Sequence, residues 1–388
     1  MTKMEVLDLK ESVAKQNYAT HGLFRFYGKL PPLVVRTLLR EAQEPIVDIM
    51  CGSGTVLLEA TIARKSSIGF DINPLSTLVS KVKTTPLSSK LLKHEAERLK
   101  GQAIPEIAER MHEFQLVPDL ERILSATDYK IPRTNMVERW FTNSAKLQLA
   151  ILKYKIDNIG DERLRSFFLV AFAAILRRAS TASPRAGKLF RSPDESERIV
   201  PDLFFDKLSH MIDSMVEFEK LAGGKPEAEV ILTDSRNLPV KDEGVPFVFW
   251  HPPYFALYRY SAIYSLELDW LGFERTLVRR GEIEEGYKTS EVSRFEDYIA
   301  DLTSVLSEVR RILARDGECC VVLADSSLRD SILPATKRFR AQAQRMGFKV
   351  SRMVRRPIHF AQASYHPSSK SHLKRKEDIA FFLRKKAG

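Results

Sequence analysis

Residues 45–55 constrain the fold of this chain more than any other stretch. A short apolar segment ends in Asp48, and the turn Cys51-Gly52-Ser53-Gly54-Thr55 precedes a helical pattern over residues 56–64. Glycines let the backbone approach a ligand closely, and the amino terminus of a helix favours a negative group. The stretch therefore predicts one half of a nucleotide-binding α/β unit. It matches neither the Gly-Lys-Ser/Thr phosphate loop nor the Gly-x-Gly-x-x-Gly fingerprint.

A second predicted strand, residues 66–70, leads to another carboxylate. Asp71 follows the glycines at about the 20-residue spacing at which a carboxylate usually accepts hydrogen bonds from ribose hydroxyls. Taken singly, Asp48 and Asp71 could each cap a helix or a turn. Because both end strands and flank one glycine turn, a nucleoside ligand is the favoured interpretation.

A stiff aromatic turn follows a third apolar segment. Residues 245–250 are predicted to be a buried strand, and His251-Pro252-Pro253-Tyr254 lies at its carboxyl end, where an open α/β sheet places its ligands. The prolines remove two backbone donors and leave carbonyls that can accept hydrogen bonds. An acceptor followed by an aromatic ring suits a planar molecule with an amino group, such as a nucleobase. By itself, however, the tetrapeptide is more often only a chain-reversing turn.

Strand and helix signals divide the 388 residues into three parts. Residues 1–85 and 226–388 are expected to form one sheet domain, and residues 86–225 a mostly helical insertion. Helical periodicity covers residues 33–40, 87–114, 118–126, 144–159, 161–180, 201–222, 293–314 and 333–346, with caps expected at Ser144 and Asp161. Further strands are expected at residues 229–233, 318–324, 349–354 and 378–383, the last two as a hairpin at the edge of the sheet.

Charge and cysteine usage narrow the possible partners. The net charge of +11 and the pI of about 9.4 favour a polyanion, although charge alone does not distinguish DNA from RNA. The cysteines, Cys51, Cys319 and Cys320, have neither disulfide nor zinc spacing, so we expect a cytoplasmic protein without a metal site. No signal peptide or membrane span is expected, because the longest apolar run, residues 167–176, is too short.

A basic, turn-rich segment in the helical part is a candidate nucleic-acid contact. Its cations are Arg178, Arg185, Lys188 and Arg191. A solvated charged loop is the more common outcome for such a segment.

A series of motifs, in this order along the chain, carries a resemblance to a known family. The motifs are residues 27–32, Asp48-x-x-Cys51-Gly52-Ser53-Gly54-Thr55, Gly69-Phe70-Asp71-Ile72-Asn73-Pro74, Asp234-Ser235-Arg236-Asn237-Leu238-Pro239 and Pro252-Pro253-Tyr254. Together they resemble the S-adenosylmethionine-dependent DNA amino-methyltransferases, which methylate N4 of cytosine or N6 of adenine. The resemblance implies the α/β, Rossmann-like fold of class I methyltransferases, with a seven-stranded, mostly parallel sheet that ends in an antiparallel hairpin. It also implies S-adenosyl-L-methionine as cofactor.

The resemblance also assigns cofactor-binding residues. The loop around Phe26, Tyr27 and Lys29 would close over the methionine end of the cofactor, and Asp48 and residues 51–55 would hold that end from below. Asp71 would take the ribose hydroxyls, Ile72 the adenine ring and Asp234 the adenine amino group. The complete expected set is Phe26, Tyr27, Lys29, Asp48, Cys51, Gly52, Ser53, Gly54, Thr55, Asp71, Ile72, Asn73, Asp234 and Ser235.

The chemistry of the aromatic turn can be argued from its residues. An exocyclic amino nitrogen is a poor nucleophile because its lone pair is delocalised into the ring, and two acceptors pulling on its hydrogens would help it attack a sulfonium methyl. The expected catalytic residues are His251, Pro252, Pro253 and Tyr254: the carbonyl of Pro252 and the side chain of His251 accept, and Tyr254 stacks on a flipped base. Methylation at C5 of cytosine is disfavoured, because it needs a cysteine nucleophile and none lies near this turn.

His251 departs from the family pattern, in which this position is usually Asp, Asn or Ser. A neutral imidazole accepts through one nitrogen only, and a protonated one does not accept. The departure is compatible with a working variant, an altered substrate, or a protein that binds nucleic acid with weak catalysis.

The leading hypothesis is methyl transfer to an amino group of double-stranded DNA, with residues 86–225 (and the loop at 362–376) as target-recognition elements. A restriction-modification role with a cognate restriction endonuclease is one form of this hypothesis. The alternatives are an RNA guanine-N2 methyltransferase and a non-catalytic nucleic-acid-binding protein on the same scaffold.

Overall fold

An eight-stranded sheet organises the computed structural model, which describes residues 4–9, 16–183, 189–192, 199–224, 228–255, 257–283, 294–328, 331–358 and 377–386. The strand order is β1-β9-β10-β6-β5-β2-β3-β4. The strands are β1 (Met4–Val6), β2 (Ile46–Asp48), β3 (Ser67–Asp71), β4 (Glu229–Leu232), β5 (Val245–Trp250), β6 (Leu313–Leu323), β9 (Phe348–Pro357) and β10 (Glu377–Lys385). All neighbours are parallel except those of β10, which is antiparallel to both β6 and β9.

The expected count of seven strands is wrong, because β1 adds an eighth. It pairs in parallel with β9, with Met4 opposite Met353, and it therefore displaces the β9–β10 pair from the edge of the sheet. All three residues of β1 are exposed, so the strand lacks the alternation of buried and exposed residues by which strands are recognised in a sequence. A separate small hairpin, β7 (Ser326–Leu328) with β8 (Ser331–Leu333), was also not expected.

Helices cover both faces of the sheet. Successive side chains of β5 pack against helices on opposite faces. Phe247 and Phe249 pack with α1 (Pro32–Leu38) and α2 (Thr55–Ile62), whereas Val248 and Trp250 face α13 (Arg294–Ile312) and α14 (Ala335–Arg345). Successive side chains of a strand point to opposite faces, so a continuous apolar run indicates a strand buried on both sides. The neighbouring cysteines of β6 are free and divide between the same two cores.

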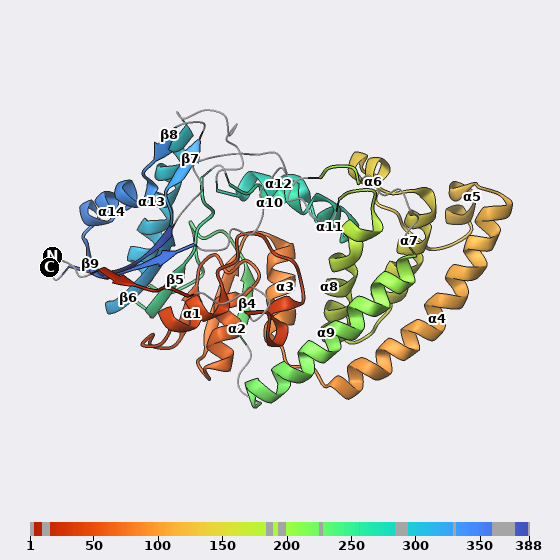
Figure 1. The fold of residues 1–388 in the computed structure, drawn as a ribbon, viewed down its shortest axis with the longest axis horizontal. Helices are drawn as coiled ribbons and strands as arrows, with labels where there is room; N and C mark the ends of the chain where they lie inside the picture. The colour runs from red at the N-terminus through yellow and green to blue at the C-terminus, as the bar shows by residue number, and fades with distance from the viewer. Residues whose placement is uncertain are drawn as a thin grey trace.

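Helices dominate the region between the two parts of the sheet. They are α3 (Pro74–Thr84), α4 (Ser89–Leu116), α5 (Leu120–Ser125), α6 (Asn135–Trp140), α7 (Asn143–Asp157), α8 (Glu162–Ala179) and α9 (Val200–Ala222). Figure 1 shows α4 to α9 gathered beside the sheet, on the side of β4 and away from β9. The capping residue of α8 is Asp161, as expected, but α7 is capped by Thr142 instead of Ser144, because the Thr142 side chain accepts from the backbone N–H of Ala145.

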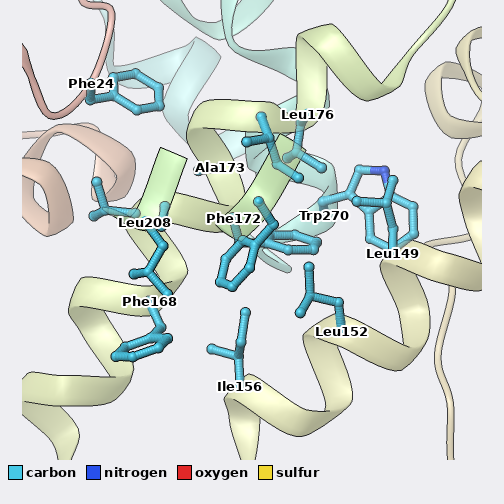
Figure 2. Packing of buried hydrophobic residues seen from close by; sticks show 14 of the residues in the cluster. Phe24, Leu149, Leu152, Ile156, Phe168, Phe172, Ala173, Leu176, Leu208 and Trp270 are labelled. Atoms are coloured by element: carbon cyan, nitrogen blue, oxygen red, sulfur yellow. The ribbon is translucent and has the colours of Figure 1, made fainter. Parts of the chain in front are cut away.

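Residues that follow the turn from His251 to Tyr254 also pack into the helical core. Short helices α10 (Tyr260–Ile263), α11 (Ser265–Trp270) and α12 (Arg275–Gly281) follow that turn. Trp270 of α11 packs edge-on against Phe172 of α8, among Leu149 and Leu152 of α7 (Figure 2). The segment after the turn therefore ties the helical region to the part of the molecule that carries His251. A further single turn, η2 (Ala19–Gly22), precedes α1.

Candidate active site

A cavity opens at the carboxyl ends of β2, β3 and β5, where the strand order reverses direction. From β2 the sheet continues through β3 and β4 on one side and through β5 and β6 on the other, so the loops after β2 and β5 leave a crevice between them. Of the expected cofactor and catalytic residues, those lining this cavity are Phe26, Lys29, Asp48, Cys51, Gly52, Ser53, Thr55, Asp71, Ile72, Asn73, Asp234, Ser235, His251 and Pro253. We call it the cofactor cavity.

Some residues of the expected set lie outside this lining, and some lining residues were not in the expected set. Gly54, Pro252 and Tyr254 do not line the cofactor cavity, and Tyr27 lines a neighbouring cavity. Lining residues outside the expected set are Gly28, Leu30, Val35, Met50, Val56, Ser76, Tyr260, Gly281, Glu282 and Ile283. Several of these come from helices and loops distant in sequence, so local spacing carried no signal for them.

The glycine turn is shaped by its backbone and by a neighbouring helix. Gly54 has φ 71°, in the left-handed region, and a Cβ there would lie 2.8 Å from Oγ of Ser80. Ser80 donates to the carbonyl of Gly52 at 2.8 Å, and Nζ of Lys83 donates to the carbonyl of Ser53 at 2.6 Å. Lys83 is buried, and burial lowers its pKa well below the usual value. Helix α3 therefore holds the turn from behind, and the motifs indicated neither of these anchors.

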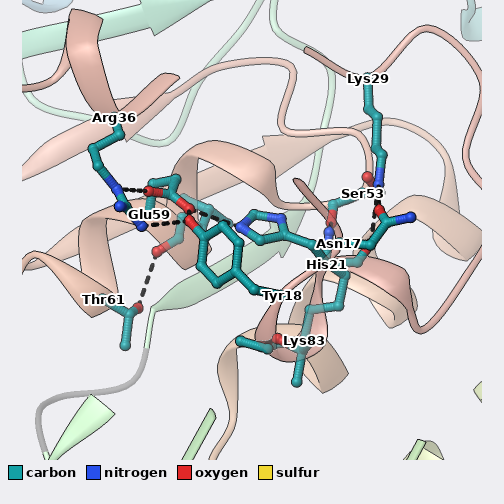
Figure 3. A network of polar contacts seen from close by, with 12 residues as sticks. Asn17, Tyr18, His21, Lys29, Arg36, Ser53, Glu59, Thr61 and Lys83 are labelled. Carbon is teal, nitrogen blue, oxygen red and sulfur yellow. Dashed lines mark hydrogen bonds and ion pairs between the residues drawn. The ribbon is translucent and has the colours of Figure 1, made fainter. Parts of the chain in front are cut away.

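A buried polar network fixes to α2 the segment that precedes the loop of Phe26, Tyr27 and Lys29, which we call the aromatic loop (Figure 3). Glu59, from the middle of α2, contacts Nε2 of His21 at 2.8 Å and Nε of Arg36 at 2.9 Å, and it also accepts from Tyr18. Burial, with Lys83, Lys29 and Arg36 as lesser causes, lowers the pKa of His21, so its imidazole is neutral and donates to Glu59. Lys29 of the loop is tied to the same segment, because its Nζ donates to the carbonyl of His21 at 3.0 Å.

Two carboxyl groups lie beside the glycine turn, Asp48 buried and Asp71 half-buried. Asp71 accepts from the backbone N–H of Gly52 and of Asn73, both at 2.8 Å. Burial raises the pKa of Asp71 to about 6, against the lowering effect of these hydrogen bonds. Burial raises the pKa of Asp48 to about 8, and the charge of Asp71 adds to the shift. Asp71 is therefore the carboxylate of the pair at neutral pH.

Polar side-chain atoms without protein partners line the same cavity. Within the described residues, Oγ of Ser53, Oγ1 of Thr55 and Nδ2 of Asn73 are buried and make no hydrogen bond. Such atoms cost free energy unless a ligand or water satisfies them. The two hydroxyls lie at the amino terminus of α2, where the helix favours a negative group. The cavity is therefore suited to a ligand with a carboxylate at this end.

The motif after β4 is held by its own arginine. Nε of Arg236 donates to Oδ1 of Asp234 at 2.9 Å, and Nη2 of Arg236 donates to the carbonyl of Gly281 at 3.0 Å. Ser235 donates to the carbonyl of Ile49. Asp234 lines the cavity, but its carboxylate is already paired with Arg236, a contact that was not expected.

The aromatic loop is packed against the tyrosines that follow the turn from His251 to Tyr254. Phe26 stacks on Tyr264, with ring centroids 5.2 Å apart, and on Tyr260, at 5.6 Å. The backbone N–H of Tyr27 donates to the phenol oxygen of Tyr264 at 2.7 Å. These tyrosines therefore build the wall between the two cavities.

The turn from His251 to Tyr254 contains a chain of hydrogen bonds that ends on β10. The phenol oxygen of Tyr254 lies 2.9 Å from Nε2 of His251 and 3.2 Å from Oδ1 of Asp378, and Asp378 is paired with Arg356. Because the Asp378 carboxylate can only accept, the Tyr254 hydroxyl donates to it, and the phenol oxygen accepts from Nε2–H of His251. This arrangement puts the lone pair of His251 on Nδ1. The carbonyl of Pro253 accepts from Tyr298 at 2.9 Å.

Tyr254 differs from the stacking ring that was expected. Its side chain is 8% exposed, and its ring packs edge-on against His251, with centroids 5.1 Å apart. In this arrangement the phenol oxygen makes hydrogen bonds to both His251 and Asp378.

The basic segment is only partly described. Arg178 is exposed at the carboxyl end of α8. Arg191 is exposed and forms an isolated antiparallel bridge with Ala182. Arg185, Lys188 and the loop at 362–376 lie outside the described residues.

The strand order, the glycine turn and the cavity at the reversal point define the class I methyltransferase type of α/β fold. This is the architecture that the motifs implied, with eight strands in place of seven. None of the helices in the described ranges has the length and apolarity of a membrane span. The same ranges contain no group of three or more His, Cys, Asp or Glu placed to hold a metal ion.

Two curated proteins are similar to the chain. It is 26% identical over 262 residues to Type II methyltransferase M.MvaI of Kocuria varians, covering 61% of this chain and 54% of that protein. It is 26% identical over 152 residues to Type II methyltransferase M.MjaII of Methanocaldococcus jannaschii, covering 38% of this chain and 27% of that protein. The chain thus spans about half the length of the first relative and about a quarter of the second. These relatives confirm the resemblance to DNA methyltransferases.

Other comparisons add little. A solved SAM-dependent methyltransferase from Methanosarcina mazei is 9% identical to the chain, covers 91% of it and 98% of its own length, and has a TM-score of 0.34, which is too low to bear on function. No family model matches the chain.

Proposed function

We propose that this protein is an S-adenosylmethionine-dependent enzyme that methylates an exocyclic amino group of a base in double-stranded DNA, N4 of cytosine or N6 of adenine. The observation that carries the proposal is that one cavity is lined both by the glycine turn, with Asp71, and by His251 and Pro253 of the turn after β5. Cofactor and acceptor would meet there. The named activity of the two relatives supports the same reaction.

The lining fits the cofactor. Ser53 and Thr55, with unsatisfied hydroxyls at the amino terminus of α2, would take the carboxylate of its methionine part. Asp71 would accept from the ribose hydroxyls and Ile72 would pack on the adenine ring, with Asp234 near the adenine amino group. When bound, S-adenosylmethionine supplies an electrophilic methyl group on a sulfonium centre.

His251 would orient the acceptor amino group. With Nε2–H directed to Tyr254, Nδ1 carries the lone pair that can accept a hydrogen from the base. The carbonyl of Pro252 would accept the second hydrogen, so that the nitrogen lone pair is freed for in-line attack. The nitrogen gains a methyl group and loses one proton, which Nδ1 takes up and releases to solvent. Tyr254 and Asp378 would act through His251 as positioning residues.

The helical region would face the DNA. Arg178 is exposed at the end of α8, where it lines the cavity that neighbours the cofactor cavity. The net charge of +11 favours a polyanion. We extend the proposal to residues 86–225 as the target-recognition region. A restriction-modification role, with a cognate endonuclease as partner, is supported only by the names of the relatives.

Methyl transfer from radiolabelled S-adenosylmethionine to duplex DNA tests the proposal. Digestion of the product to nucleosides, followed by mass analysis, would identify N4-methylcytosine or N6-methyladenine. A parallel assay on tRNA covers the guanine-N2 alternative: label in tRNA and none in DNA would overturn the proposal. DNA binding without label in either substrate would favour the non-catalytic alternative.

A further inference from the structure

A second cavity lies on the other side of the aromatic loop. It shares Phe26, Gly28 and Lys29 with the cofactor cavity, and its remaining walls come from residues 17–27, α8, α9 and the segment 258–267. The motifs that indicated the cofactor site did not indicate this cavity. Among the described residues, its lining combines cations, tyrosine rings and one carboxyl group, Glu267 of α11.

Glu267 is a buried carboxyl group in a cavity wall that also carries cations and tyrosine rings. It is 5% exposed, and within the described residues its Oε2 is buried without a hydrogen-bond partner. Burial raises the pKa of Glu267 to about 7, against the lowering effect of Arg177. A buried carboxyl oxygen without a donor is costly to the folded protein, so a hydrogen-bond donor on a ligand would relieve that cost.

Two of the lining cations, Arg178 and Lys207, lie on neighbouring helices, and Arg25, Lys29 and Arg177 line the cavity as well. Arg178 is at the end of α8, and Lys207 is on α9. The pKa of Lys207 is lowered to about 8, mainly by burial and further by the charge of Arg178. An anion between Arg178 and Lys207 would offset this repulsion, and a phosphate is the anion that such pairs commonly bind in nucleic-acid sites.

Tyrosine rings are the third feature of the second cavity. Tyr27, Tyr258 and Tyr264 line the cavity between the aromatic loop and α11. Tyr27 and Tyr258 have ring centroids 6.0 Å apart, and Tyr264 is held by the backbone of the loop. Aromatic side chains of this kind bind nucleobases by contact with their faces and edges.

We propose that the second cavity binds one nucleotide of the DNA strand, with an exocyclic amino group of its base donating to Glu267 and its phosphate between Arg178 and Lys207. The assignment of DNA as the source of this nucleotide rests on the function proposed above. Thymine has no exocyclic amino group, so the site discriminates against it.

Fluorescence anisotropy with labelled (dC)12, (dA)12 and (dT)12 tests the site in the full-length protein without cofactor. We expect (dC)12 and (dA)12 to bind roughly tenfold more tightly than (dT)12, the size of effect that one hydrogen bond to a charged group produces. Glu267→Leu removes the acceptor at similar volume and is expected to abolish the preference. Glu267→Gln keeps an acceptor oxygen and is expected to retain part of it.

Lys207→Met tests the phosphate contact, with Lys220→Met, an exposed lysine on the same helix, as the matched control. We expect Lys207→Met to weaken binding to all three oligonucleotides and Lys220→Met to leave binding near that of the wild type. Thermal unfolding of each variant establishes that it is folded, and Glu267→Leu is expected to unfold at a higher temperature than the wild type because it removes a buried unsatisfied carboxyl.

Two results would overturn the nucleotide site: an unchanged base preference in folded Glu267→Leu, or equal effects of the two lysine variants. Methyl transfer to DNA, measured on the same samples, separates this failure from failure of the proposed function. Transfer with no dependence of binding on Glu267 would reject the second site alone. Base preference through Glu267 with no transfer would reject the methyltransferase proposal and leave the site standing.

Discussion

The phenol oxygen of Tyr254 lies 2.9 Å from Nε2 of His251, three residues away in the same turn. Because the Tyr254 hydroxyl is itself directed to Asp378, the contact selects the imidazole tautomer with its lone pair on Nδ1. The family that the motifs resemble usually has Asp, Asn or Ser at this position, and the contact leaves His251 with a lone pair on Nδ1 that can accept a hydrogen bond. The following predictions start from this contact.

Tyr254→Phe separates the two roles that the ring could have. The variant keeps an aromatic ring but loses the hydroxyl that orients His251, so we expect kcat to fall about 10–100-fold with little change in KM for the cofactor. Steady-state kinetics with DNA measure the split, and Tyr154→Phe on α7 is the control. Full activity in Tyr254→Phe would show that the ring, and not the hydroxyl, matters.

His251→Leu is expected to lower methyl transfer by a factor of roughly 100 or more, because it removes one of two acceptors for the amino group. Cofactor binding, followed by calorimetry, is expected to stay within about twofold of the wild type. His251→Asp restores an acceptor and is expected to recover part of the activity. Exposed His210, on α9, provides the control His210→Leu. Retained transfer in His251→Leu would remove His251 from the mechanism.

Cofactor affinity is expected to depend on pH through Asp71. Its pKa, raised to about 6 by burial, makes it a carboxylate at pH 7.5 and a neutral acid at pH 5. The carboxylate accepts from both ribose hydroxyls better than the acid does, so we expect Kd to rise about tenfold between pH 7.5 and pH 5. Calorimetry over this range checks the profile. Asp71→Asn is expected to bind weakly and without this pH dependence, whereas Asp213→Asn, exposed on α9, is expected to match the wild type.

The stability of the cofactor-free protein is expected to fall as pH rises between about 4 and 8. Asp48 and Asp71 both have raised pKa values in the folded protein, about 8 and about 6, so the folded state binds their protons more tightly than the unfolded state does. Their contribution is complete below the unfolded pKa of 3.8 and is lost as pH rises through the folded values. Each group contributes a slope of at most about 1.4 kcal/mol per pH unit. Urea unfolding of Asp48→Asn is expected to give a flatter profile, and an equally steep one would contradict the shift.

Gly54→Ala is expected to destabilise the protein by about 1–3 kcal/mol and to weaken cofactor binding. Its left-handed φ of 71° and the 2.8 Å approach of a new Cβ to Ser80 both oppose the substitution. Gly101→Ala is the matched control: Gly101 is inside α4 with nothing within 4 Å of an added Cβ, so alanine there is expected to stabilise by about 0.5–1 kcal/mol. Thermal or urea unfolding measures both, and similar effects of the two would contradict the strain argument.

Long apolar and periodic segments were predictable, and short or exposed ones were not. The buried strand β5 was predicted with its observed bounds, because its side chains enter the cores on both faces of the sheet. Strand β1 was missed because only its pairing with β9 makes it a strand. Ser144 was expected to cap α7, but Thr142 does so, since a cap depends on where the backbone turns.

By itself, the sequence determined the alternation of strands and helices, the glycine turn, the strand-end aspartates and the order of motifs, because these follow from local spacing and burial pattern. Only the tertiary structure decided what surrounds those residues. It placed Lys83 beneath the glycine turn and Asp378 behind Tyr254, 124 residues away in the chain. It also brought Glu267 to the wall of the second cavity. Such contacts depend on how distant segments pack, and packing distances are not encoded in the spacing of any single motif.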